Sequence, residues 1–189
     1  MMLRLVVFLS LLNTISLFGD PSSLFFIKHA RTEDQKRWGL MRCSALPDNE
    51  GMLFHYSSPK HVRIWSFNCL IDLSVAFLDE QKRICEIQNL RAFPERMDPK
   101  RPVLSTRDFA LYPAQDPIVI FFQKGSISSS VPVCYALEMN RGWFEKNRVE
   151  VGDVLEWNSK DNTAFFERRD SSPILQNEIR TPSGVNAEK

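Results

Sequence analysis

Leu73-Ser74-Val75-Ala76-Phe77-Leu78, then Asp79-Glu80-Gln81-Lys82, then Arg83-Ile84-Cys85-Glu86-Ile87 is the stretch of sequence that decides the fold. The two outer segments carry strand-forming residues, whereas the four polar residues between them suit a turn. The stretch therefore predicts a β-hairpin. Residues 62–77 as a whole are also rich in strand formers.

Further short strands are expected on both sides of this hairpin. Their predicted ranges are Leu24–Lys28, Met52–Tyr56, Pro132–Met139, Val154–Trp157 and Thr163–Arg168. Residues 91–105 contain three prolines and are expected to form a loop. The apolar run at residues 118–122 is not counted among the helices.

Only two short helices are expected. Thr32 provides an N-cap and Gln35, three residues later, completes a capping box, while Gly39 ends or bends that helix. Residues 142–149 suit one or two further turns. Many short strands with two short helices predict a mainly β chain of the α+β type. We expect a single small β-sandwich or partly closed barrel.

Composition limits the possible partners. The chain has 189 residues, of which 43% are hydrophobic, so it can bury one core. It has 24 Lys and Arg against 23 Asp and Glu, without a basic block. Nucleic acid is therefore not an expected partner, because its backbone attracts a concentrated cationic face.

The N-terminus predicts export. Arg4 precedes an apolar run from Leu5 to Phe18, and Gly19 offers a small residue for cleavage. The run is shorter than the roughly 20 residues of a spanning helix, so no transmembrane span is expected after processing. We predict a signal peptide at residues 1–19, a β-rich domain at 22–169 and a disordered tail at 170–189. The location would be periplasmic or extracellular.

An ordered series of short motifs resembles the prokaryotic family known as domain of unknown function 192. Its members share a Gly-Leu-Met motif, then Gly-Met-Leu-Phe, a central Trp and Asn, and a late Leu-Glu. Here the matching residues are Ala30, Thr32, Gly39-Leu40-Met41, Gly51-Met52-Leu53-Phe54, Trp65, Asn68, Leu73, Phe77, Leu137-Glu138, Gly142 and Gly152-Asp153. The resemblance spans about residues 24 to 158, with a longer middle between Phe93 and Val133. It implies a fold but no known activity.

The polar positions of this pattern are less well kept than the apolar ones. Cys43 replaces the usual Arg, Phe67 a usual Lys or Arg, and Cys69 the usual Thr. Packing positions alone preserve a fold, whereas a polar site needs its own donors and acceptors. If the two replaced positions face each other, Cys43 and Cys69 would form a disulfide in an oxidising compartment.

The sequence predicts no catalytic residue, metal or cofactor. Cys69 with His61 would be a thiol hydrolase pair, but neither belongs to a nucleophile motif. His55 and His61 lack the spacing that helps specify zinc. Asp72 and Asp79 are conceivable carboxylates of a glycoside hydrolase, although Asp79 lies in a predicted turn.

Three residues remain as candidates for ligand binding. Asn68 and Glu138 are polar residues within apolar strands, where each needs solvent or a hydrogen-bonding partner. Trp65 is an aromatic that could stack on a ligand. We therefore expect an exported, non-enzymatic module that binds a small molecule or an envelope protein. The alternatives are a thiol- or carboxylate-dependent hydrolase and a structural domain whose site has decayed.

Overall fold

A computed structural model describes residues 24–168 of the chain. The predicted signal peptide at 1–19 and the predicted tail at 170–189 lie outside these residues. Between residues 24 and 168, no helix combines the length and apolar character needed to cross a membrane.

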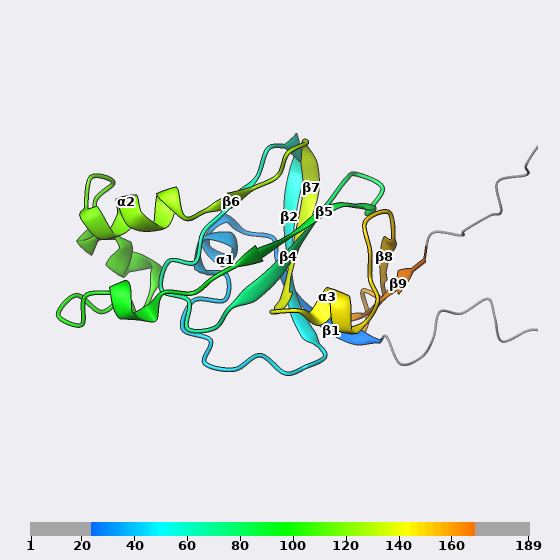
Figure 1. The fold of residues 1–189 in the computed structure, drawn as a ribbon, viewed down its shortest axis with the longest axis horizontal. Coiled ribbons are helices and arrows are strands. Elements are labelled where there is room, and N and C mark those ends of the chain that lie inside the picture. Colours follow the sequence, from blue (N-terminus) through cyan, green and yellow to red (C-terminus); the bar gives the residue numbers. More distant parts are fainter. Residues whose placement is uncertain (1–23, 169–189) are drawn as a thin grey trace, which may run out of the picture.

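Seven strands form one curled sheet in the order β5-β4-β7-β2-β1-β9-β8 (Figure 1). Only β1 and β2 are parallel, and the other neighbours are antiparallel. The strands are β1 (Phe25–Ala30), β2 (Glu50–Lys60), β4 (Leu73–Leu78), β5 (Ile84–Leu90), β7 (Val133–Asn140), β8 (Val154–Trp157) and β9 (Thr163–Glu167). A separate pair joins β3 (Arg63–Ile64) to β6 (Ile127–Ser128).

The two ends of the curled sheet meet at one point, which makes it a partly closed barrel. The backbone N–H of Ile84 in β5 donates to the carbonyl of Asp153 at 2.9 Å, and that of Leu155 in β8 donates to Lys82 at 3.0 Å. Arg83 and Val154 also form an isolated antiparallel bridge. The mainly β expectation and the hairpin of β4 and β5 are both confirmed.

Two of the three α-helices follow the sequence prediction. Helix α1 (Glu33–Trp38) has the full capping box of Thr32 and Gln35, and Gly39 is its C-cap with a φ of 51°. Helix α3 (Trp143–Lys146) follows Gly142, whose φ is 78°. Glycine tolerates these positive φ values because it has no Cβ.

The expectation of only two helices is corrected by the apolar run at residues 118–122, which lies in a third helix, α2 (Pro117–Lys124). Asp116 is its N-cap and accepts a hydrogen bond from the Ile118 N–H at 2.8 Å. Pro117 occupies the first turn, where its missing N–H leaves no hydrogen bond unmade. Asp-Pro before an apolar run was thus a helix signal that the strand-like composition masked. The predicted loop at residues 91–105 contains one 3-10 segment, Pro94–Arg96, and a second, Thr106–Leu111, follows it.

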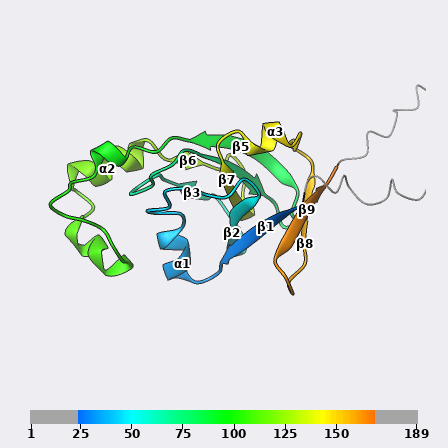
Figure 2. The same cartoon turned by 90° about the horizontal axis from the view of Figure 1, so that it is seen from below.

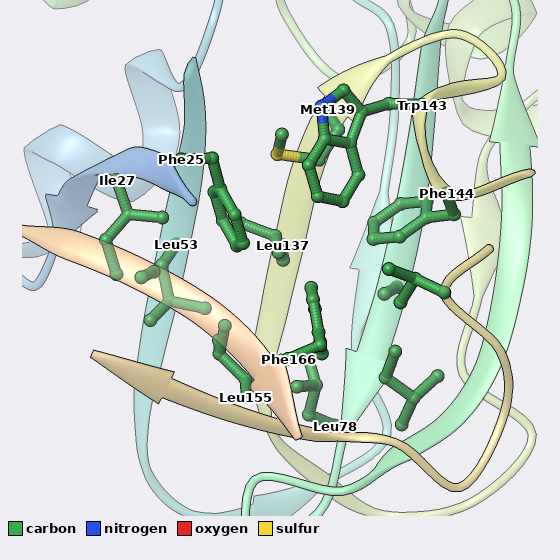
Figure 3. Close-up of a cluster of buried hydrophobic side chains, with 14 residues drawn as sticks. Phe25, Ile27, Leu53, Leu78, Leu137, Met139, Trp143, Phe144, Leu155 and Phe166 are labelled. Carbon is green, nitrogen blue, oxygen red and sulfur yellow. The ribbon is translucent and has the colours of Figure 1, made fainter. Parts of the chain in front are cut away.

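The sheet separates two layers of apolar side chains. Inside the curl, aromatic side chains from β1, α3 and β9 meet aliphatic side chains from the central strands (Figure 3). Phe25 packs edge-on against Trp143, with ring centroids 4.8 Å apart, and against Phe166 at 5.7 Å. On the outer face, Phe54, Val75 and Phe77 pack under the segment that follows α1. Strand β4 is buried along its whole length because both its faces are covered.

A third apolar cluster lies beyond the sheet. The segment around α2 projects to the side of the sheet opposite β8 and β9, as both views show (Figures 1 and 2). Its side chains Val103, Tyr112, Val119 and Phe122 pack on Phe67. The long middle of the chain therefore does not extend the barrel; it builds a lobe against the loop that carries Trp65.

Candidate ligand-binding site

Two cavities adjoin each other where this lobe meets the Trp65 loop, and we call them together the Trp65 cleft. One has a volume of about 280 Å³ and the other about 340 Å³, and both are lined by Trp65 and Gln123. The larger cavity is completed by Arg63 and Ser126. The smaller one is completed by Arg37, Phe67, Phe109, Tyr112, Ala114 and Val119.

Aromatic rings hold the wall of the smaller cavity in place. The rings of Trp65 and Phe67 are stacked, with centroids 5.0 Å apart and planes 19° from parallel. Phe67 meets Tyr112 edge-on at 5.2 Å and Phe122 at 5.4 Å. Phe67 is only 1% exposed, so Trp65 is supported from behind by a buried ring. The apolar residue at position 67, where the resemblance implies a cation, is explained by the lobe that packs on it.

One arginine of the supporting lobe is paired with carboxylates of the same lobe. Arg101 forms ion pairs with Asp98 and with Asp116, and its guanidinium lies 4.4 Å from the Tyr112 ring centroid. Hydrogen bonds from Arg101 lower the pKa of both carboxyl groups. Tyr112 donates its hydroxyl to the Arg101 carbonyl at 2.8 Å. These contacts fix one wall of the cleft by joining residues of the lobe to one another.

Asn68 joins the Trp65 loop to the lobe and to the segment after α1. Its side-chain amide donates to the Val103 carbonyl at 3.0 Å, and its backbone carbonyl accepts from the Arg42 N–H at 2.9 Å. It is 5% exposed and has a positive φ of 57°. Asn adopts this left-handed conformation more readily than most residues. Asn68 does not line the Trp65 cleft, so a role in ligand contact stays a prediction.

Glu138 lies at the centre of the sheet, opposite Met52 in β2 and Val75 in β4. Its side chain is buried, and its Oε2 atom has no hydrogen-bond partner among residues 24–168. A Cβ on Gly39 would lie 4.0 Å from that oxygen. Burial raises the pKa of Glu138 to about 8. Trp65, Asn68 and Glu138 therefore do not share one cleft, because Glu138 points into the outer apolar layer.

The four cysteines are free thiols, so the Cys43–Cys69 disulfide is not formed in this structure and stays a prediction. Burial raises the pKa of the Cys69 thiol far above its ordinary value, and the charges of Glu138 and Cys43 act in the same direction. A catalytic cysteine needs the opposite shift. His61 instead contacts the Ser129 carbonyl, at 3.1 Å.

The other chemistries considered from the sequence also lack their geometry. Asp72 and Asp79 flank the six residues of β4, which separates them by roughly 23 Å at the rise of an extended strand. The paired carboxylates of glycosidases lie within about 10 Å of each other. Among the described residues, no three His, Cys, Asp or Glu side chains are grouped to hold a metal ion.

A histidine pair on the neighbouring strands β1 and β2 was not expected from the sequence. His29 Nδ1 and His55 Nε2 are 2.8 Å apart, so one ring donates and the other accepts. Trp157 and Tyr135 pack around His55 at 5.9 and 5.3 Å between ring centroids. Burial lowers the pKa of His55 to about 4, and the charges of His29, Arg31 and Lys36 act in the same direction.

We predict that acid weakens the fold through His55. Its pKa is lower in the folded chain than the ordinary 6.5, so above pH 6.5 the ring is neutral in both the folded and the unfolded chain and stability is highest. Below pH 6.5 the unfolded chain takes up a proton that the folded chain does not. The contribution of His55 to stability is therefore lost as the pH falls from 6.5 toward 4. In chemical denaturation, the stability of His55→Phe relative to the wild type should rise as the pH falls from 7 to 4. His61→Gln, at an exposed position, is the control; the same dependence of stability on pH in all three proteins would contradict the prediction.

Most residues of the Trp65 cleft could not be found from motifs. Trp65 was identified, but Arg37, Arg63, Phe109, Tyr112 and Gln123 were not. The available signal was the concentration of aromatic residues in the long middle, from Phe93 to Phe122. Aromatic residues of that density in a predicted loop indicate a packed lobe rather than an open connection.

Comparison with known proteins gives a family and a fold. The DUF192 family model, described as "Uncharacterized ACR", matches residues 18–112. A crystal structure of a protein of unknown function from Novosphingobium aromaticivorans DSM 12444 is 24% identical with a TM-score of 0.52. The match covers 70% of this chain and 75% of that one.

A second crystal structure, from Sinorhizobium meliloti 1021, has a description that proposes a role in transcription regulation. It is 23% identical with a TM-score of 0.51, and the match covers 71% of this chain and 89% of that one. At these identities the two structures share a fold with this protein and carry no activity to it. No curated protein matches the sequence. The ordered motifs, the curled sheet and the family match over half of the chain agree, and the protein belongs to the uncharacterised DUF192 family.

Proposed function

We propose that the protein is a non-enzymatic binding module that holds a small, largely apolar ligand in the Trp65 cleft. The observation that carries the proposal is a pair of adjoining cavities of about 280 and 340 Å³ that share one half-buried tryptophan. Small-ligand sites are typically concave, lined by aromatic and apolar side chains, and contain few polar groups. The stacked Phe67 presents Trp65 as a fixed surface on which a planar group can lie.

Binding of the neutral fluorophore N-phenyl-1-naphthylamine tests this proposal. Its emission should rise on addition of the wild-type protein, and Trp65→Ala should weaken binding by on the order of tenfold or more. Trp65→Phe keeps a ring in the cleft and should lose less. Trp157→Phe, in β8, is the control and should bind like the wild type. No emission change with the folded wild type, or equal affinity in Trp65→Ala, would refute the proposal.

Export is the second part of the proposal, and the sequence of residues 1–19 supports it. Cell fractionation of the full chain with a C-terminal tag should place it outside the cytoplasm. Intact-mass measurement should show a mature chain beginning near residue 20. Retention in the cytoplasm at full mass would reject this part without affecting the Trp65 cleft.

A structural role with a decayed polar site is the alternative that one observation favours. Glu138 is a buried carboxylate whose Oε2 atom has no partner among residues 24–168, and Cys43 and Cys69 stand where the family resemblance implies polar residues. An earlier polar cluster that lost its other members would leave such a group. This alternative predicts that no small molecule binds at either position, which the fluorophore experiment decides for the cleft.

A further inference from the structure

The polar groups at the rim of the Trp65 cleft are mainly hydrogen-bond donors. Arg37 and Arg63 each present a guanidinium, which donates and never accepts. Gln123 lines both cavities and its side-chain amide can donate as well. The Ser126 hydroxyl donates to the Gln123 carbonyl at 2.7 Å, which leaves its oxygen as an acceptor. A ligand group that satisfies this rim must therefore be rich in acceptors.

Within the described part of the chain, the two rim arginines also lack a counter-ion. None of the ion pairs among residues 24–168 includes Arg37 or Arg63, and no Asp or Glu lines either cavity. Arg101, in the lobe around α2, is paired with two carboxylates. Arg101 therefore has a structural role, whereas the guanidinium groups of Arg37 and Arg63 are available to an external anion.

The position of each arginine suggests how a ligand would lie. The Arg37 guanidinium lies 4.9 Å from the Phe109 ring centroid, so it continues the aromatic wall of the smaller cavity. Arg63 is positioned in β3 by the strand pairing with Ser128 in β6. It lines the more polar, larger cavity together with Gln123. Rings therefore fit best in the Arg37 cavity, and an anionic group fits best beside Arg63.

We infer that the ligand of the Trp65 cleft is an aromatic acid, with its rings on Trp65 and a carboxylate, sulfonate or phosphate group bound by Arg63. This inference rests on the proposed function, since it names the chemical class of ligand for the same cleft. Two oxygens of such an anionic group can pair with guanidinium through two parallel hydrogen bonds, which gives orientation as well as affinity. Arg63 is thus the residue that sets ligand specificity.

Two fluorophores with one ring system test the inference on the full chain. Anilinonaphthalene-8-sulfonate carries a sulfonate, whereas N-phenyl-1-naphthylamine has the same rings without it. The wild type should bind the sulfonate probe about tenfold more tightly, as one charge-assisted contact provides. Arg63→Gln should abolish that preference, because it should weaken binding of the sulfonate probe about tenfold more than binding of the neutral probe. Arg107→Gln removes an exposed arginine of the same lobe and should have no effect.

The possible results separate this inference from the proposed function. If both probes bind equally, or if Arg63→Gln weakens both alike, the aromatic-acid inference is wrong while the cleft remains a binding site. If the sulfonate probe binds Trp65→Ala as well as the wild type, it lies elsewhere and the inference is wrong. If the neutral probe does not bind the folded wild type, the proposed function fails, and the inference that rests on it fails too. Near-ultraviolet circular dichroism of each variant confirms that the compared proteins are folded.

Discussion

Replacing Glu138 by Gln is expected to raise the free energy of unfolding above pH 8 by as much as about 5 kcal/mol. At pH 4.5 the same substitution should change stability little. The effect therefore depends on pH, which distinguishes it from an ordinary change of packing. Gln has almost the shape of a protonated glutamic acid, so the comparison isolates the charge.

The sign follows from burial of the carboxylate. The pKa of Glu138 is about 8 in the folded chain and near 4.5 in an exposed glutamate. Below pH 4.5 the group is protonated in both states and has no charge to bury. Between pH 4.5 and 8 the unfolded chain releases a proton that the folded chain retains, so stability falls by roughly 1.4 kcal/mol per pH unit. Above pH 8 the loss is complete, and the Glu138→Gln variant avoids it.

Urea denaturation of the wild type and of Glu138→Gln at pH 5, 6, 7 and 8.5 measures this difference. Glu167→Gln, which neutralises an exposed carboxylate in β9 of the same sheet, is the matched control and should show no such trend. A Glu138→Gln difference that stays constant from pH 5 to 8.5 would show that the carboxylate has a partner in solution.

The loops near Glu138 contain several residues with positive φ values. Arg42 and Asn68 both have positive φ values, 58° and 57°, and the Arg42 N–H donates to the Asn68 carbonyl. Gly39, whose φ is 51°, lies beside the carboxylate. Unusual backbone conformations cluster where a structure is shaped by function. The loops after α1 and before β4 meet here, and the second of them carries Trp65.

Local sequence signals predicted the elements that short-range physics determines. The β4–β5 hairpin follows from strand formers around four polar residues, and α1 follows from the reciprocal hydrogen bonds of Thr32 and Gln35. Both depend on contacts within a few residues of the chain.

The parts that failed depend on contacts between distant residues. Helix α2 has a strand-like composition that masked its local N-cap, and its apolar face is buried by the packing of Val119 and Phe122 on Phe67 in a remote loop. The Trp65 cleft unites Arg37 with Phe109, which no local pattern connects. Likewise, Glu138 follows the alternation of side chains along β7, but its face is covered by the segment after α1, which no local pattern indicated.

Replacing Gly51 by Ala is expected to destabilise the protein by about 3 kcal/mol or more, which is at the upper end for an overpacked core. A Cβ at this position would lie 2.8 Å from the Glu138 carbonyl oxygen and closer still to the Met139 sulfur. Met139 could rotate only within a core where it is fully buried, and the backbone of β7 cannot move without disturbing its pairing with β2 and β4. This close approach of β2 to β7 explains why the Gly-Met-Leu-Phe motif begins with glycine.

Variants of two other glycines distinguish this steric clash from the cost of placing an alanine at a positive φ. Gly125 ends α2 with a φ of −85°, and a Cβ there would meet its nearest atom at 3.6 Å, so Gly125→Ala should be neutral or slightly stabilising. At Gly142 a Cβ would meet no atom of the described residues within 4 Å, but the φ of 78° should make Gly142→Ala cost about 1 kcal/mol. Thermal and urea unfolding should therefore rank Gly51→Ala far below both. A Gly51→Ala protein as stable as Gly125→Ala would mean that β2 and β7 are farther apart than the structure places them. The glycine of the motif would then need another explanation.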